Sequence, residues 1–358
     1  MASRALSLLK ELVRFPSLSR QESAICAFVQ GYAEAAGLPT CRWGNSVCFW
    51  LGEGTPRLLL NSHLDVVPPS RAHPFDPFDP VELGGLLFGR GTADAKASGA
   101  AMTAALIELA EEGWSPLQGQ VMVALTECEE TDFEHNGLRA LRKVVPKPDA
   151  ALVGEPTNLV PMVAQKGLMI LRVDAKGKSA HAARAKLGEN AILKALRDIQ
   201  RLEDLTFARE DPWVGYPSVN ITTIEGGIAR NVIPDSCTFY VDIRSTPAYT
   251  HAEITQHVQS ILESEVTVHS DRIVPVATSV DADIVQACLR ALPGSRPTGS
   301  PTASDWIYLS DVPTVKIGPG TSEKSHTSDE SIDIAELEQA VDAFKHIVRE
   351  YFAGSADT

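Results

Sequence analysis

Hydrophobic and polar residues follow two different periods in the first half of the chain. Apolar residues that recur every three or four positions predict amphipathic helices, whereas short apolar runs bounded by Gly, Pro or charged residues predict buried strands. The helices are expected at residues 5–15, 21–36, 95–112 and 137–145, and the strands at residues 47–51, 57–64, 120–126 and 150–154. Because helices and strands alternate, this half predicts an α/β domain in which helices pack on a sheet.

The pattern changes after Lys166 and changes back near the end of the chain. Strands are expected at residues 168–174, 219–224 and 238–244, and helices at residues 191–202 and 251–262, which is typical of an α+β unit. A helix at 281–292, a strand at 314–317 and a helix at 334–352 return to the α/β pattern. We therefore expect one domain, residues 1–164 and 274–358, interrupted by a second, residues 165–273, with crossings near residues 161–167 and 268–276.

Length, composition and charge narrow the classes of function. The chain has 358 residues, 44% of them hydrophobic and 22% charged, which is typical of a globular protein and sufficient for two domains. Its net charge of -14 argues against nucleic acids and anionic membranes as partners, because these bind clustered Lys and Arg. The N-terminal segment predicts an amphipathic helix interrupted by Lys10, Glu11 and Arg14, so we expect neither a signal peptide nor a membrane span and place the protein in the cytoplasm.

The six cysteines favour the same location. They form no CxxC pair and no regular framework of the kind that small secreted proteins use. Scattered single cysteines are mostly small buried hydrophobic residues, so we do not expect them to bind a metal. They stand at positions 26, 41, 48, 128, 237 and 288.

A histidine and a carboxylate end the apolar strand predicted at residues 57–64. His63 and Asp65 are two positions apart, so an extended backbone points both side chains to the same side. A metal-bound histidine needs its second ring nitrogen held by a carboxylate or a carbonyl, and Asp65 could hold it. The pair alone is weak evidence, because His and Asp often stand together without a metal.

More acidic residues stand at the ends of other predicted elements. Asp94 opens the Ala-rich helix, where an ordinary N-cap aspartate is the alternative. The glycines before it do not form GxGxxG, which argues against a dinucleotide-binding domain. Four acids directly follow the strand at 120–126, and crowding beside a buried strand end favours a divalent cation over a solvated turn. They are Glu127, Glu129, Glu130 and Asp132.

Glu155 and His326 complete the set of candidate ligands. Glu155 follows the strand at 150–154, and His326 lies in a glycine-rich polar loop after the strand at 314–317. Ligands of open α/β sheets bind at the carboxyl ends of the strands, so we expect these residues to converge. Two histidines with three acids suit zinc, cobalt or manganese better than calcium or magnesium.

The order of these motifs resembles the metallohydrolase family that includes acetylornithine deacetylase, succinyl-diaminopimelate desuccinylase, aminoacylase and carboxypeptidase G. The resemblance spans nearly the whole chain. It implies a zinc-exopeptidase-like α/β catalytic domain, with a mixed sheet flanked by helices, and an inserted α+β ferredoxin-like lid and dimerisation domain. The motifs are HLDVVP from His63, FGRGTADAKA from Phe88, ECEET from Glu127, GEPT from Gly154, GKSAHAARAKLGENAI from Gly177, GGIARNVIPDSC from Gly226, VDIR from Val241 and SHTSDE from Ser325.

The resemblance implies a cofactor of two divalent metal ions, zinc in first place, with cobalt or manganese as alternatives. The implied ligands are His63 and Glu155 on one ion, Glu130 and His326 on the other, and Asp94 as a bridge between both.

Two further acids have implied roles beside the metals. Asp65 orients the imidazole of His63. Glu129 is the general base, which takes a proton from the bridging water and delivers it to the departing amine, and this role needs a carboxylate free of metal. Glu127 is a neighbouring alternative, but a pair of glutamates followed by a small polar residue fits Glu129 and Glu130 better.

The resemblance gives the inserted domain a part in catalysis as well. His181 would reach the active site of the partner subunit and stabilise the tetrahedral oxyanion, which implies a homodimer. Asn231 and Arg244 match positions that contact the substrate, and a guanidinium is a suitable partner for a substrate carboxylate. For Arg244, an ordinary surface ion pair is the alternative.

The branch of the family decides the expected substrate. The loop that carries His326 and the segment at 302–305 look most like acetylornithine deacetylase, which implies removal of an acetyl group from N-acetylornithine or N-acetylcitrulline in arginine biosynthesis. A desuccinylase and a metallo-exopeptidase are alternatives with the same chemistry, and an inactive metabolite-binding relative is the alternative of another class. Ala95 and Ala97 replace residues usual in the family, which leaves open whether the Asp94–Ala95 peptide is cis.

Overall fold

The computed structural model describes residues 2–131 and 134–354, so Asp132 of the acidic run lies outside the described residues. The chain forms two compact units. The first contains the described residues of Met1–Val163, Thr278–Thr298 and Ser304–Thr358. The second contains Ala164–Ala277 and also Gly299–Ala303, a short return that no hydrophobic pattern predicted.

A large mixed sheet forms the centre of the first unit; its strand β15 belongs to the second unit, and β8 and β16 each begin in the first unit and end in the second. Its strand order is β1-β2-β6-β3-β7-β17-β8-β15, and β16 pairs with β8. The strands β6, β3, β7 and β17 run parallel to one another, whereas β2 is antiparallel to β6. These parallel strands are almost completely buried, which is why they read as continuous apolar runs. The strands are β1 (Thr40–Trp43), β2 (Ser46–Glu53), β3 (Arg57–His63), β6 (Gly119–Thr126), β7 (Ala150–Val153), β8 (Met162–Gln165), β15 (Val276–Ala277), β16 (Thr298–Ser300) and β17 (Thr314–Lys316).

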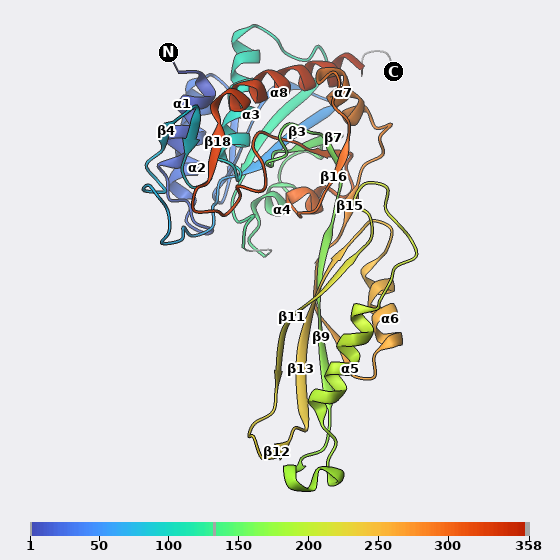
Figure 1. The fold of residues 1–358 in the computed structure, drawn as a ribbon. Helices are drawn as coiled ribbons and strands as arrows, with labels where there is room; N and C mark the ends of the chain where they lie inside the picture. Colours follow the sequence, from blue (N-terminus) through green and yellow to red (C-terminus); the bar gives the residue numbers. More distant parts are fainter. Residues whose placement is uncertain (1, 132–133, 355–358) are drawn as a thin grey trace. The chain divides into compact units, whose positions relative to one another are not determined.

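Helices cover this sheet, as Figure 1 shows. The Ala-rich helix α3 is buried along most of its length and packs against α1 and α8, while α7 packs against α8. Its small side chains allow close approach, since a Cβ at Gly99 would lie 3.3 Å from a methyl group of Leu125. The helices are α1 (Arg4–Val13), α2 (Ser23–Ala35), α3 (Lys96–Glu111), α4 (Gly137–Leu141), the 3-10 helix η2 (Asp305–Leu309), α7 (Asp283–Ala291) and α8 (Ile334–Gly354).

A small antiparallel sheet pairs a strand near the end of the chain with strands from its first third. Its order is β18-β5-β4, with Ser331 opposite Phe88. The strands are β4 (Val81–Leu83), β5 (Leu86–Phe88) and β18 (Ser331–Asp333). Strands of three residues carry too short a pattern to be predicted from the sequence.

The second unit is a ferredoxin-like βαββαβ fold. Its four-stranded sheet has the order β11-β13-β9-β14 with antiparallel neighbours, and α5 and α6 lie on one face of it (Figure 1). Burial alternates along β9 and β13, which places one face of each strand in the core. The elements are β9 (Gly167–Lys176), α5 (Ala191–Glu203), β11 (Ser218–Gly226), β13 (Ser236–Ser245), α6 (His251–Ile261) and β14 (Glu265–Ile273). The predicted fold class, a mixed α/β domain with an inserted α+β unit, is confirmed.

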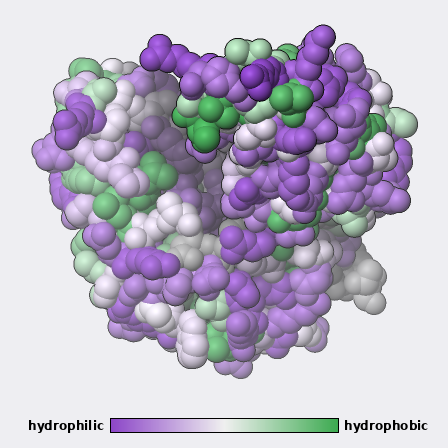
Figure 2. Space-filling model, turned by 90° about the horizontal axis from the view of Figure 1, so that it is seen from below, coloured by the Kyte–Doolittle hydropathy of each residue, from purple (hydrophilic) through white to green (hydrophobic). Residues whose placement is uncertain are grey.

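The surface of the protein is mostly polar. Most of the face shown in Figure 2 is hydrophilic, with apolar residues in small separate groups. Within residues 2–131 and 134–354, none of the helices is both long enough and apolar enough to span a bilayer.

Candidate metal centre

The predicted ligands of the first unit converge at the carboxyl ends of parallel strands. His63 is the last residue of β3 and lies opposite Thr126, the last residue of β6. Glu129 and Glu130 follow β6, and Glu155 follows β7, the other neighbour of β3. The sheet order therefore brings together acids that are far apart in the sequence.

His63, Asp94 and Glu155 form the first group of possible metal ligands. His63 Nε2 lies 3.3 Å from Asp94 Oδ1 and 3.9 Å from Glu155 Oε1. One donor atom from each of the three residues lies within 4.8 Å of the others. The peptide bond between Asp94 and Ala95, whose geometry the sequence left open, is cis.

Asp94, Glu130 and His326 form the second group. His326 Nε2 lies 3.0 Å from Glu130 Oε1 and 3.4 Å from Asp94 Oδ2. Asp94 therefore belongs to both groups and presents a different oxygen to each. This position fits a carboxylate that bridges two cations, which is the role that the resemblance implied for Asp94; that role stays a prediction.

The protonation of His63 shows that the first group fits a cation. Its Nδ1 lies 2.9 Å from the backbone carbonyl oxygen of Asp65, which can only accept, so Nδ1 carries the hydrogen. Its Nε2 is buried, has no hydrogen-bond partner among the described residues, and faces carboxylates. Although burial alone would lower it, the carboxylates of Asp65 and Asp94 raise the pKa of His63 well above its ordinary value. Positive charge is thus favoured at this position, and imidazole with carboxylate oxygens suits a first-row divalent metal.

Asp65 organises the glutamate pair more than the imidazole. Its carboxylate lies 3.5 Å from His63 Nδ1, farther than its own backbone carbonyl. It accepts hydrogen bonds from the backbone N–H groups of Glu129 and Glu130, at 3.0 and 3.1 Å, and from the hydroxyl of Ser19. Burial would raise the pKa of Asp65, but His63 and these hydrogen bonds lower it, so Asp65 is a carboxylate that fixes the turn after β6.

Glu129 lies beside the ligands but in neither group. Desolvation raises its pKa well above the ordinary value, His63 opposes this shift, and the charges of Glu155 and Asp305 add to it. Burial and the charge of Asp94 likewise raise the pKa of Glu155 to about 8. Buried acids with raised pKa values that lie close together are typical of a site completed by positive charge.

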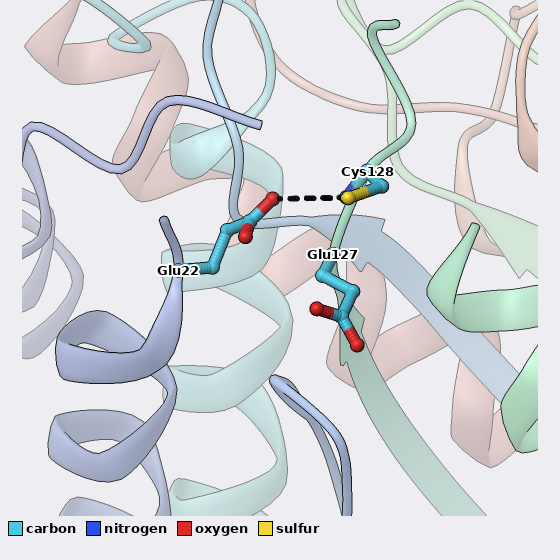
Figure 3. Close-up of side chains that lie close together, drawn as sticks. All are labelled: Glu22, Glu127 and Cys128. Atoms are coloured by element: carbon cyan, nitrogen blue, oxygen red, sulfur yellow. Dashed lines mark hydrogen bonds between the residues drawn. The ribbon is translucent and has the colours of Figure 1, made fainter. Parts of the chain in front are cut away.

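Glu127, the alternative to Glu129, turns away from both groups. Its Oε1 accepts the backbone N–H of Asn45 at 2.9 Å. It forms a third group with Glu22 and Cys128, in which the thiol and the backbone N–H of Cys128 donate to Glu22 Oε1 at 3.6 and 3.1 Å (Figure 3). Burial raises the pKa of the Cys128 thiol to about 12, so the sulfur keeps its proton and can donate it to Glu22.

The sequence reasoning missed two buried charged residues near the ligands. Asp305 accepts hydrogen bonds from Asn136 Nδ2 at 2.6 Å and Thr126 Oγ1 at 3.2 Å, and burial raises its pKa to about 6. Lys316 ends β17, and burial lowers its pKa although the charges of Glu155 and Glu129 oppose the shift. The segment at 302–305 was noticed as a motif without a role for Asp305, and nothing around Lys316 marked it as unusual.

The remaining predicted residues lie in the second unit. The pairing of β10 (Ala180–His181) with β12 (Val232–Ile233) brings His181 close to Asn231, whose backbone oxygen accepts the N–H of Ala182 at 2.9 Å. His181 is exposed, and its Nδ1 accepts the N–H of Ala183 as the 3-10 helix η1 (Ala182–Leu187) begins. Arg244, near the end of β13, pairs with Asp242 at 2.9 Å, which is the ion pair considered as its alternative role. Their roles toward a substrate stay predictions.

Comparison with known sequences identifies relatives of several activities. The chain matches the model of "Peptidase family M20/M25/M40" over residues 59–350. It is 32% identical to "Acetylornithine deacetylase" of Myxococcus xanthus over 80% of this chain and 78% of that protein. It is 29% identical to a "Probable carboxypeptidase" of Emericella nidulans, over 97% and 89% of the two chains. It is 26% identical to "Succinyl-diaminopimelate desuccinylase" of Parvibaculum lavamentivorans, over 98% and 96%.

Solved structures share the fold. Aminopeptidase PepT from Bacillus cereus matches with a TM-score of 0.80 and 21% identity, over 97% of this chain and 98% of that chain. A dinuclear metal binding peptidase from Bacillus subtilis matches with a TM-score of 0.72 and 18% identity, over 96% of both chains. Both comparisons show that the chain has a known fold.

Proposed function

The chain belongs to peptidase family M20/M25/M40 and is a metal-dependent hydrolase of amide bonds, and we propose that it removes an N-acetyl group from a small amino acid such as N-acetylornithine or N-acetylcitrulline. The arrangement that carries the chemistry is the pair of ligand groups that share Asp94, with Glu129 beside them. The choice of an acetyl substrate is supported by the motifs around His326 and at residues 302–305, and by the name of the Myxococcus relative.

We propose a centre of two divalent ions, zinc in first place and cobalt or manganese as alternatives. His63, Asp94 and Glu155 would hold one ion, and Asp94, Glu130 and His326 the other. When bound, two such ions would polarise the amide carbonyl and lower the pKa of the attacking water.

Glu129 carries the proton in this scheme. A carboxylate oxygen of Glu129 accepts a proton from the attacking water as the oxygen of that water bonds to the acyl carbon. The same oxygen then donates this proton to the amine nitrogen, whose bond to the acyl carbon breaks. Glu129 belongs to neither ligand group, so its carboxylate stays free to carry the proton between the two steps. Asp65 keeps Glu129 in place through the backbone hydrogen bond.

Metal removal tests the function directly. Protein stripped with a chelator is expected to regain activity as zinc or cobalt is added back, with a plateau near two equivalents per chain. Release of free amine is measured with N-acetylornithine, N-acetylcitrulline, N-succinyl-diaminopimelate and a dipeptide. Faster turnover of the acetyl substrates supports the proposal.

Two alternatives are distinguished by the same assay. If the chain acts like the relative named as a desuccinylase, amine should be released fastest from the succinyl substrate. If it acts like the relative named as a carboxypeptidase, amine should be released fastest from the dipeptide. Metal binding without hydrolysis of any substrate would instead indicate an inactive relative that binds a metabolite.

The homodimer is also part of the proposal. Apolar side chains are exposed on α5 and on the neighbouring edge strand β11, including Leu193 at 52%, Leu196 at 48% and Ile224 at 51% exposed. An exposed apolar surface beside a sheet edge is typical of a surface that another chain covers. In such a dimer, the partner subunit's His181 would stabilise the oxyanion, and Asn231 and Arg244 would contact the substrate.

Charged residues on this surface are expected to separate the dimer. The double variant Leu193→Glu with Leu196→Glu should elute as a monomer, measured by size-exclusion chromatography with light scattering, and should lose most activity because His181 would no longer reach a second subunit. Leu117→Glu is the control, since Leu117 is fully exposed in the first unit. A wild-type chain that is already monomeric and fully active would contradict the proposed dimer.

We also propose a cytoplasmic location. It is supported by the cysteines, all six of which are free thiols, five of them buried.

A further inference from the structure

Glu330 lies where the loop that carries His326 meets the loop that carries Asp94. Glu330 directly precedes β18, and Phe88 at the end of β5 lies opposite the first residue of β18. The N–H of Gly89 donates to the carbonyl oxygen of Glu330 at 3.2 Å. The two loops are therefore joined at their bases by backbone hydrogen bonds.

The carboxylate of Glu330 accepts hydrogen bonds from the loop that leads to Asp94. Its Oε1 accepts the backbone N–H groups of Gly91, Ala93 and Asp94, each at 3.0 Å. Its Oε2 accepts Arg90 Nη1 at 2.6 Å. Glu330 is 2% exposed and Arg90 1%, so these are buried, charge-assisted hydrogen bonds.

Glu330 is linked to two predicted ligands, Asp94 and His326, but its carboxylate contacts the ligand atoms of neither. One of its hydrogen bonds comes from the backbone of Asp94, the residue shared by both ligand groups. Its own backbone lies four positions after His326 in the same loop. Loss of the hydrogen bonds of Glu330 would therefore change the position of Asp94 relative to His326. The position of His63 relative to Glu155 would stay the same, because the pairing of β3 with β7 holds it.

We propose that Glu330 is a positioning residue for the metal centre: it sets the separation of Asp94 and His326 and so the affinity for the ion of the second group. The inference rests on the proposed dinuclear centre. Outer residues that orient metal ligands typically change metal affinity by about 10- to 100-fold when replaced.

The test is the zinc affinity of each equivalent, measured by equilibrium dialysis on purified protein, and not activity. Glu330→Gln removes the charge and is expected to weaken the second equivalent by about 10- to 100-fold and the first by less. Lys345→Met is the matched control, because Lys345 is also a buried charge of the first unit, paired with Glu108 and Glu112. It should lower the thermal midpoint and leave both zinc affinities unchanged.

The outcomes separate a positioning role from a merely structural one. If Glu330→Gln unfolds, Glu330→Asp is measured in its place, since it keeps the charge but is one methylene too short to reach both Arg90 and the backbone N–H groups. A lowered midpoint with two wild-type zinc affinities, in whichever of these variants folds, overturns the inference. A wild-type chain that binds fewer than two ions overturns the proposed metal centre itself, and the inference with it.

Discussion

Glu129→Gln is expected to lower kcat by about 10²- to 10⁴-fold, the usual contribution of a general acid–base group. Glutamine fills the same space but cannot accept the proton of the attacking water. Because Glu129 lies in neither ligand group, the variant should still bind two metal ions. The measurement is kcat on the preferred acyl substrate, together with the metal content of the same preparation.

The matched control is Glu127→Gln, the same substitution two positions away. Glu127 binds the backbone of Asn45 and belongs to no group with His63 or His326, so its variant should keep activity close to wild type. Full turnover in Glu129→Gln, or a loss in Glu127→Gln as large as that in Glu129→Gln, would show that the base is wrongly assigned.

Asp94→Asn is expected to weaken both metal ions and to abolish measurable activity. Asp94 faces His63 with one oxygen and His326 with the other, and an amide retains only one oxygen and no charge. The loss of affinity should exceed the roughly 10- to 100-fold expected for a residue outside the ligand set. His326→Ala, in contrast, should remove only the ion of the second group. Metal analysis after dialysis, with zinc titration of the apo-protein, measures both effects.

His346→Ala serves as the control for these variants, because His346 is an exposed histidine on α8 in the same unit. It should bind two ions. If Asp94→Asn retained both ions at wild-type affinity, Asp94 would be no bridge. If His326→Ala lost both, the two groups would not bind independently.

Local pattern was sufficient for the elements that build the core. The buried strands β3, β6 and β7 and the helices α3 and α8 lie within a few residues of their predicted positions, because continuous apolar runs and helical periodicity are signals within one segment. The edge strand β14 was missed, since most of its side chains are exposed and its polar residues carry no apolar run. Helix α4 ends at Leu141, four residues earlier than predicted.

The candidate ligands could be predicted because of where they stand. His63 ends a buried strand, Glu130 and Glu155 each follow the end of one, and parallel strands bring such positions to one edge of the sheet. Glu330 ends the SHTSDE motif, but its role could not be predicted, because its partners are the Arg90 side chain and the backbone N–H groups of a loop, 236 to 240 positions away. Asp305 also received no role, because its side-chain partners Asn136 and Thr126 are 169 and 179 positions away.

The sequence by itself determined the buried strands and the long helices of the core, which residue types could supply metal ligands, and at which strand ends they stand. The tertiary structure decided the rest: that Asp94 presents one oxygen to each ligand group, that His63 directs its Nε2 at the carboxylates, and that Glu127 turns away while Glu129 does not. The physical reason is the separation along the chain over which each kind of signal acts. Periodicity and burial are properties of neighbouring residues, whereas a donor placed within a few ångströms depends on sheet order and on loops packed from distant parts of the chain.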